Sequence, residues 1–273
     1  MPVYLAHGGC GRTMKENVNG TEICYRIEGE GENKVLLLHG WGCDMKLMQP
    51  VADALKTDHR TLMVDFPGHG ESGRPPEPWG VPEYAACLRE LLNRLSFIPC
   101  SVVAHSFGAR VAAWLEAEEP GMFERIIFTG GAGIRPKPTE EARERAARYQ
   151  KLKGYCEAVK KVPLLGKAAE GWEDKLRKKY GSRDYNALDA EMRQTFVKVV
   201  NQDLTDLYSR FQTSTLLIWG DEDTETPVWM AKEMEKRIPD AGLVILEGGT
   251  HFAYLEQIGR FNLIVRQFLK GDE

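Results

Sequence analysis

Short, uninterrupted apolar runs alternate with amphipathic segments along most of this 273-residue chain. Such runs are typical of strands buried on both faces, and the segments between them have helical spacing. This alternation predicts a mostly parallel sheet covered by helices on both faces. We expect strands at residues 35–38, 61–65, 101–103, 125–129, 215–219 and 243–246, and helices at 45–55, 81–95, 109–119, 228–237 and 261–269.

The N-terminal region adds an antiparallel hairpin to this pattern. Residues 13–28 alternate around Asn19-Gly20, a dipeptide that tolerates positive φ at both positions of a tight turn. Ile23, Tyr25 and Ile27 then fall on one face of the returning strand. We therefore expect an N-terminal antiparallel hairpin before the first buried run.

Residues 135–210 interrupt the alternation and are predicted to form a helical insertion. The segment is rich in Glu, Arg, Lys and Ala, with aromatic residues between them. Residues 135–183 carry 15 Lys or Arg against 7 Asp or Glu, a net of +8 in a chain whose formal charge is −4. Two interpretations stay open: a solvated helical face, or a positive lid that attracts anionic substrates. The expected core is therefore residues 1–134 and 211–273.

Composition narrows the class of protein further. The net charge of −4 argues against general nucleic-acid binding, which requires a basic surface. No apolar run is long enough to span a bilayer, and residues 1–7 lack the pattern of a secretion signal, so we expect a cytoplasmic protein without a membrane contact. The 6 cysteines have neither disulfide-framework nor zinc spacing, so we expect neither a disulfide framework nor a metal site.

A candidate nucleophile lies in the pentapeptide Ala104-His105-Ser106-Phe107-Gly108, between a predicted strand and a predicted helix. A serine on such a sharp turn has a strained backbone, which is tolerated when the residues two before and two after it are small. Ala104 and Gly108 meet this requirement. Taken alone, the pattern also fits a serine that caps a helix N-terminus.

A base and an acid are available at matching positions. A serine hydroxyl is a weak nucleophile at neutral pH and needs a base that a third group orients. His251 follows the predicted strand 243–246, and Asp223 follows the strand 215–219. Open α/β sheets place their chemistry on loops at the carboxyl ends of such strands. The chain order serine, acid, histidine is the order found in hydrolases of this architecture.

At this point the chain resembles the α/β-hydrolase fold superfamily, in the serine-nucleophile branch with a helical cap. The resemblance implies an eight-stranded, mostly parallel α/β sheet flanked by helices. Alanine at 104 and threonine at 250 stand where glycine is common, and neither change removes a catalytic group. The segments that carry the resemblance are the oxyanion loop 39–42, the D-x-x-G-x-G-x-S loop 65–72, the nucleophile elbow 104–108, the acid loop 220–223 and the histidine loop 250–252.

The resemblance also implies roles for individual residues. Asp223 is the favoured acid, and Asp221 stays open as an alternative because Asx side chains often cap such turns. The oxyanion donors are the backbone N–H groups of Trp41 and Phe107. The side chains of Trp41, Phe107 and His105 are expected at the substrate.

The leading functional hypothesis is a carboxylesterase-type serine hydrolase that cleaves a small to medium ester through an acyl-enzyme, without a metal or an organic cofactor. The alternative within enzymes is hydrolysis of a carbon–carbon bond in a vinylogous diketo acid, for which a basic lid would suit the anion. Thioester and lactone hydrolysis and perhydrolysis use the same groups. From another class, the chain could be a ligand-binding protein that keeps the hydrolase fold without catalysis.

Overall fold

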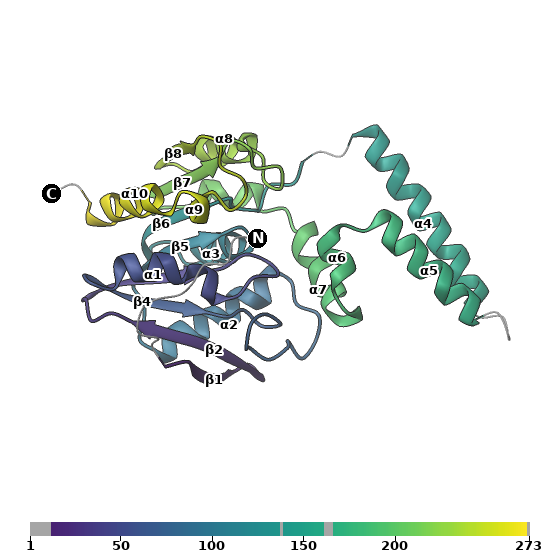
Figure 1. Cartoon of the computed structure of the whole chain (residues 1–273), viewed down its shortest axis with the longest axis horizontal. Coiled ribbons are helices and arrows are strands. Elements are labelled where there is room, and N and C mark those ends of the chain that lie inside the picture. The colour runs from purple at the N-terminus through teal and green to yellow at the C-terminus, as the bar shows by residue number, and fades with distance from the viewer. Residues whose placement is uncertain (1–11, 137–138, 161–165, 272–273) are drawn as a thin grey trace. The chain divides into compact units, whose positions relative to one another are not determined.

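The computed structural model describes residues 12–136, 139–160 and 166–271 (Figure 1). Residues 1–7, on which the expectation about a secretion signal depends, and Cys10 lie outside this range. None of the five cysteines within it forms a disulfide. Among the described helices, none is both long and apolar enough to cross a membrane.

One eight-stranded sheet forms the centre of the fold, as predicted. The strand order is β1-β2-β4-β3-β5-β6-β7-β8. Strand β2 runs antiparallel to both neighbours, and the other neighbouring pairs are parallel. The strands are β1 Met14–Val18, β2 Thr21–Glu28, β3 Asn33–Leu38, β4 His59–Val64, β5 Cys100–His105, β6 Phe123–Thr129, β7 Thr215–Gly220 and β8 Ala241–Leu246.

The edge hairpin forms at the predicted dipeptide. Asn19 has a φ of 51° and Gly20 a φ of 80°, and Val18 pairs with Thr21 across the turn. Positive φ at both turn residues matches the twist of the flanking strands, so the register of β1 on β2 follows from this dipeptide.

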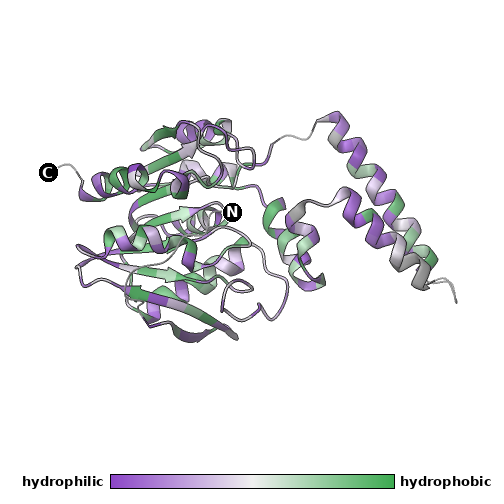
Figure 2. Cartoon of the chain, in the orientation of Figure 1, coloured by the Kyte–Doolittle hydropathy of each residue, from purple (hydrophilic) through white to green (hydrophobic). Residues whose placement is uncertain are grey.

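Helices cover both faces of the sheet. Strand β3 shows why its sequence is apolar without a break: Leu36 and Leu38 face one core cluster, and Val35 and Leu37 face the other. The first face packs against α2 Val81–Arg94, α3 Phe107–Glu118 and α8 Val228–Arg237. The second packs against α1 Gln49–Leu55, the short helix α9 Ala253–Glu256 and α10 Ile258–Lys270. Figure 2 shows strands β3 to β8 mainly in the hydrophobic colour, whereas β1 and β2 are mixed.

The chain divides into two compact units. Among the described residues, those within 1–134 and 198–273 form the sheet unit, and those within 135–197 form a helical unit. The predicted insertion started at the same residue but ended at 210. The helices of this region are α4 Glu140–Lys160, α5 Gly166–Tyr180, α6 Arg183–Ala187 and α7 Ala190–Asn201, followed by the 3-10 helix η2 Thr205–Arg210.

Residues 198–210 have hydrogen-bond partners in the sheet unit, which explains the earlier boundary. Lys198 Nζ donates to the carbonyl of Pro78 at 2.6 Å, and Arg110 Nη1 donates to the carbonyl of Gln202 at 2.8 Å. The N–H of Leu204 donates to the carbonyl of Gly133 at 2.9 Å. This last bond joins the segment that leads into the helical unit to the segment that returns from it.

Candidate active site

Ser106 lies on a strained turn between β5 and α3. Its backbone φ is 50° and its ψ is −105°, a combination that is unfavourable for a residue with a side chain. The turn is packed closely, because a Cβ atom on Gly108 would lie 2.7 Å from the Cβ of Leu38. A small residue at 108 is therefore required, as the sequence pattern predicted.

Backbone hydrogen bonds hold the turn in place. The N–H of Ser106 donates to the carbonyl of Thr129 at 3.2 Å, and the Ser106 carbonyl accepts from the N–H groups of Ala109 and Ala132. The residue is thus fixed against the end of β6 on one side and the first turn of α3 on the other. A strained φ persists only where surrounding contacts determine it in this way.

His251 and Asp223 lie in direct contact. Nδ1 of His251 donates to Oδ2 of Asp223 at 2.8 Å, and the Asp223 side chain is fully buried. With its proton on Nδ1, a neutral imidazole presents a lone pair at Nε2. The predicted acid and base are therefore paired, with Nε2 as the nitrogen that can accept a proton.

The loop of Asp223 supplies further hydrogen bonds to its carboxylate. Oδ1 accepts from the N–H groups of Glu225 and Thr226 at 2.9 and 2.8 Å, and the Thr226 hydroxyl donates to Oδ2 at 2.8 Å. Burial alone raises the pKa of Asp223, but the hydrogen bond and charge of His251, with the Thr226 contacts, outweigh it and the pKa is lowered. Asp223 is thus held as a carboxylate.

Asp221, the alternative acid, is turned toward a different partner. Its Oδ1 accepts from the N–H of Gly248 at 2.6 Å, which joins the β7 and β8 loops. This bond matches the turn-capping role of Asx side chains. Of the two acids, Asp223 is the one hydrogen-bonded to His251.

His105 connects the serine turn to the histidine loop. Its Nε2 donates to the carbonyl of His251 at 3.0 Å, and the two imidazole rings lie 4.8 Å apart. Burial lowers the pKa of His105 to about 3, so the ring is neutral. The residue before Ser106 therefore holds the backbone of His251. At 1% exposure, its ring is enclosed by His251, Phe252 and Tyr254.

The loop after β3 approaches the serine turn closely. A Cβ atom on Gly40 would lie 2.7 Å from Nδ1 of His105 and 3.3 Å from the Cβ of Ser106. His39 fixes this loop, because its Nδ1 donates to the Gly40 carbonyl and its Nε2 accepts from the N–H of Phe66. Only glycine fits at 40, and the backbone that leads to Trp41 lies beside Ser106.

Aromatic rings surround the two predicted oxyanion residues. The ring of Phe107 is buried against Trp41, Phe66 and Tyr84, and the ring of His69 stacks on it. The Trp41 ring is half-buried and contacts His69 edge-on. Burial lowers the pKa of His69 to about 4.

The loop after β4 is built around one buried carboxylate. Asp65 accepts from the N–H groups of Met45 and Glu71 at 2.7 and 2.8 Å, and a Cβ atom on Gly70 would collide with it. The Ser72 hydroxyl donates to the Asp65 carbonyl. These contacts give the D-x-x-G-x-G-x-S segment a structural explanation: the loop folds back onto its own first residue.

Three residues near His251 were not singled out from the sequence. Thr226 contacts both Asp223 Oδ2 and His251 Nδ1, the carboxylate of Glu225 lies 3.5 Å from His251 Nε2, and a Cβ atom on Gly130 would lie 3.1 Å from His251 Nδ1. A threonine three residues after an acid is a turn-forming spacing that could have indicated Thr226.

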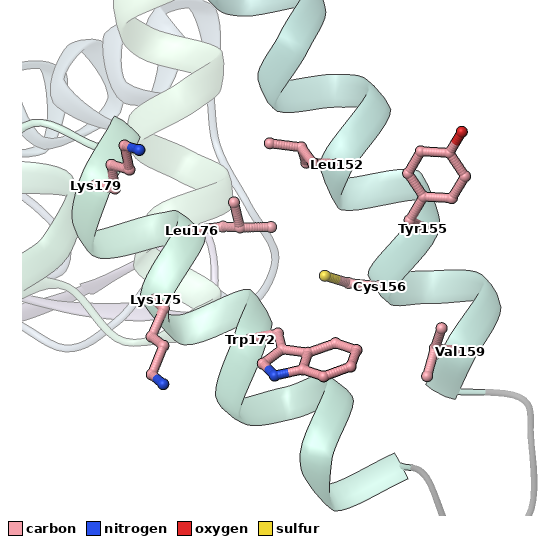
Figure 3. Close-up of a pocket in the computed structure, with 8 residues that line it drawn as sticks. All are labelled: Leu152, Tyr155, Cys156, Val159, Trp172, Lys175, Leu176 and Lys179. Carbon is pink, nitrogen blue, oxygen red and sulfur yellow. The ribbon is translucent and has the colours of Figure 1, made fainter.

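The helical unit contains an apolar groove of its own. Leu152 and Cys156 of α4 face Leu176 and Trp172 of α5 across the space between the two helices (Figure 3). The groove has a volume of about 360 Å³, and the Trp172 side chain on its rim is 53% exposed. Within the described residues, no group of three or more His, Cys, Asp or Glu side chains is arranged to hold a metal ion.

Comparison with known proteins identifies relatives along nearly the whole chain. An uncharacterized protein of Mycobacterium tuberculosis is 27% identical over an alignment of 280 positions, which covers 94% of this chain and 80% of that protein. A pimeloyl-(acyl-carrier protein) methyl ester esterase of Neisseria meningitidis is 24% identical over an alignment of 254 positions, which covers 87% of this chain and 94% of the esterase.

A solved structure shows the same fold. The esterase of Exiguobacterium antarcticum superimposes with a TM-score of 0.72 at 20% identity, over 96% of this chain and all of that chain. The sequence model of the alpha/beta hydrolase family matches residues 35–262. This range includes β3 from Val35 onward and all of the later strands. This chain belongs to the alpha/beta hydrolase family.

Proposed function

We propose that this chain is a serine hydrolase that cleaves small to medium carboxylic esters. Ser106 is the nucleophile, His251 the base and Asp223 the acid that orients it. The observation that carries the proposal is the hydrogen bond of 2.8 Å between His251 Nδ1 and the buried Asp223, in a chain whose Ser106 occupies a strained strand-to-helix turn. Both features are characteristic of an activated serine.

The reaction follows from the protonation states. Ser106 Oγ attacks the ester carbonyl while His251 Nε2 accepts the hydroxyl proton, and the Asp223 carboxylate stabilises the imidazolium. The N–H groups of Trp41 and Phe107 bind the oxyanion of the tetrahedral intermediate. The alcohol leaves with the proton from Nε2. Water then attacks the acyl-enzyme while His251 accepts its proton, and Ser106 Oγ leaves with that proton as the acid is released.

The preference for esters is supported by the relatives. One of them is named as a methyl ester esterase, and its sequence aligns over 87% of this chain. The close approach of Gly40 to Ser106 supports an oxyanion role for the loop that continues into Trp41. A backbone donor there would be independent of the side chain at 41.

The test is turnover of 4-nitrophenyl butyrate by the full chain and by Ser106→Ala. We expect kcat/KM to fall by about 10⁴-fold or more while the circular dichroism spectrum is unchanged. Ser209→Ala is the matched control, because this serine is exposed and its hydroxyl donates to the nearby carbonyl of Asp206. Labelling by a fluorophosphonate, followed by peptide mass spectrometry, should place the adduct on Ser106.

Other outcomes would point to other functions. A labelled Ser106 with no ester turnover, together with cleavage of a vinylogous diketo acid, would replace the esterase proposal by carbon–carbon hydrolysis. No adduct on the folded protein would indicate a binding role. Full activity in Ser106→Ala would remove the serine mechanism altogether.

A further inference from the structure

The two ring nitrogens of His251 each lie near a carboxylate, and the two carboxylates differ in environment. Asp223, fully buried, contacts Nδ1. Glu225 has its Oε2 atom 3.5 Å from Nε2, and its side chain is 62% exposed. The proposed mechanism uses Nε2 to exchange a proton with Ser106 and with the leaving alcohol, so Glu225 lies on the side of His251 where the reaction occurs.

Backbone hydrogen bonds fix the main chain at Glu225. The N–H groups of Glu225 and Thr226 both donate to Asp223 Oδ1. The carbonyl of Thr226 accepts from Trp219 Nε1 at 2.6 Å, and Pro227 restricts the residue before it to an extended conformation. None of these contacts involves the Glu225 carboxylate. A substitution at 225 therefore leaves the anchoring of Asp223 intact.

The electrostatic consequence concerns the substrate. A scissile carbonyl within reach of Nε2 brings the groups next to it close to the Glu225 carboxylate. Four of the five residues from 221 to 225 are acidic, so no basic residue of this segment offsets that charge. Water reaches Glu225 and screens it, which limits the effect to about 3- to 10-fold for a unit charge on the substrate.

We propose that Glu225 determines the charge preference of the active site, favouring esters with a cationic group close to the scissile carbonyl over anionic ones. The inference rests on the proposed function, because it assigns a substrate class to the same site. An anionic diketo acid would meet the same carboxylate and be disfavoured by it.

A second effect of Glu225 must be separated from this one. Its carboxylate also lies beside the imidazolium that forms during the reaction, and stabilisation there would change the rate for every substrate equally. Charge preference instead changes the ratio between substrates of equal shape. The ratio is therefore the quantity to measure.

Three 4-nitrophenyl esters of similar length provide that ratio. The cationic one carries 4-(trimethylammonio)butyrate, the neutral one its carbon isostere 5,5-dimethylhexanoate, and the anionic one hemiglutarate. For the unmodified chain we expect kcat/KM of the cationic ester to exceed that of its neutral isostere by about 3- to 10-fold, with the anionic ester lowest. Added salt should reduce the difference.

Variants assign the preference to the residue. Glu225→Gln should bring the cationic and neutral esters to within about 2-fold of each other, and Glu225→Lys should reverse the order. Glu222→Gln is the matched control, because it removes one charge from an exposed residue of the same loop. Unchanged ratios in both Glu225 variants, or an equal change in Glu222→Gln, would overturn the proposal.

A second measurement separates this inference from the esterase assignment. Phosphonofluoridates with and without a trimethylammonio group form a bond from Ser106 Oγ to phosphorus as fluoride leaves, whatever the natural substrate is. If Ser106 is labelled but no ester is hydrolysed, the esterase proposal fails, and the ratio of labelling rates in Glu225→Gln still decides the charge preference. Equal labelling rates for the two probes in the unmodified chain would refute it.

Discussion

Thr226 makes the acid and the base of the proposed triad depend on one hydroxyl. It is 6% exposed, donates to Asp223 Oδ2 at 2.8 Å and lies 3.3 Å from His251 Nδ1. Without this donor, Oδ2 of the buried carboxylate keeps only His251 as a hydrogen-bond partner among these contacts. Loss of a hydrogen bond to a buried charged group raises the free energy of the folded state. We expect the position of the Asp223 carboxylate, and with it the orientation of His251, to become less well fixed.

Replacing Thr226 by valine tests this contact. We expect kcat for 4-nitrophenyl butyrate to fall by about 10-fold, because a lost hydrogen bond to a charged group is worth roughly 1–3 kcal/mol. Thr226→Ser keeps the hydroxyl and should restore most of the activity. Equal kcat values for the valine variant and the unmodified chain would show that the hydroxyl is dispensable.

Gly130 is the second residue-scale test, and the chain provides its own control. Gly130 has a φ of 52°, and a Cβ atom there would lie 3.1 Å from His251 Nδ1 and 3.3 Å from Asp223 Oδ2. Gly121 has a φ of 88°, with open space around the added atom. Both alanine variants carry backbone strain of about 1 kcal/mol, but only Gly130→Ala presses on the His251–Asp223 pair.

We therefore expect Gly130→Ala to lose at least 10-fold in kcat/KM, and Gly121→Ala to lose stability in urea without losing activity. The comparison separates strain from contact, since the two substitutions are chemically the same. Similar activity in the two variants would mean that His251 shifts freely around the added methyl group.

At the scale of the elements, the loops at the carboxyl ends of β3, β4 and β5 are built around neutral histidines. Burial lowers the pKa of His39 and of His105 to about 3 and that of His69 to about 4, below the ordinary value of 6.5. The unfolded chain therefore binds protons at these residues at a higher pH than the folded chain does.

Stability should consequently fall as the pH drops from about 6.5 toward 4, by up to about 1.4 kcal/mol per pH unit for each histidine. The lowered pKa of Asp223 acts in the same direction below its ordinary value of 3.8, whereas the raised pKa of Asp65, a result of burial, opposes it. Urea unfolding at pH 7.5, 6.0 and 5.0 measures this slope.

His105→Gln should reduce the pH dependence of the unfolding free energy by up to about 1.4 kcal/mol per pH unit, the contribution of one histidine. The glutamine amide can still donate to the carbonyl of His251 but does not titrate. The measurement uses the free energy of unfolding and does not require activity. A free energy that is independent of pH between 7.5 and 5.0 would contradict the expected proton uptake.

The sequence predicted most elements because their signals are local. A strand such as β3, with Leu36 and Val35 packed on opposite faces, must be apolar at every position, and the Asn19-Gly20 turn requires two positive φ values. The helix expected at 45–55 instead begins with the 3-10 helix Met45–Met48, and α1 follows with Pro50 in its first turn. Proline there favours a new helix start.

The part of the candidate site that was predicted also depends on local sequence motifs. Motif spacing identified Ser106, Asp223 and His251, and the structure confirms the fold that such motifs imply. The contact of Glu225 with His251 depends on how one turn directs its side chains, which no local pattern encodes. The end of the helical unit at residue 197 also has no signal in the sequence, because α7 continues through this position without a break.

At the scale of the whole molecule, the two units differ in how they are stabilised. The sheet unit has two buried clusters, whereas α4 and α5 share a narrow seam with a groove along it. Figure 2 shows α4 in hydrophilic and intermediate colours over much of its length. Little apolar area is buried per residue there, so local unfolding of α4 and α5 should be easier than unfolding of the sheet.

Hydrogen exchange tests this difference. We expect amides of α4 and α5 to exchange faster than those of β3 and β5, and Leu176→Ala to accelerate the two helices by a further factor of about 10. Leu263→Ala on α10 is the control, because that side chain is 70% exposed. Exchange in α4 and α5 as slow as in β3 would contradict a separately opening unit.

The bond between Leu204 and Gly133 has a consequence for how such a chain can change over time. Gly133 has a φ of 152° and no room for a side chain beside the Tyr208 hydroxyl, so the junction is tight as well as closed. A segment inserted between Gly133 and Leu204 forms a loop that this bond closes, and the entropic cost of closing a loop grows only with the logarithm of its length. Natural or engineered grafts of very different size can therefore enter at this point without rebuilding the sheet beneath.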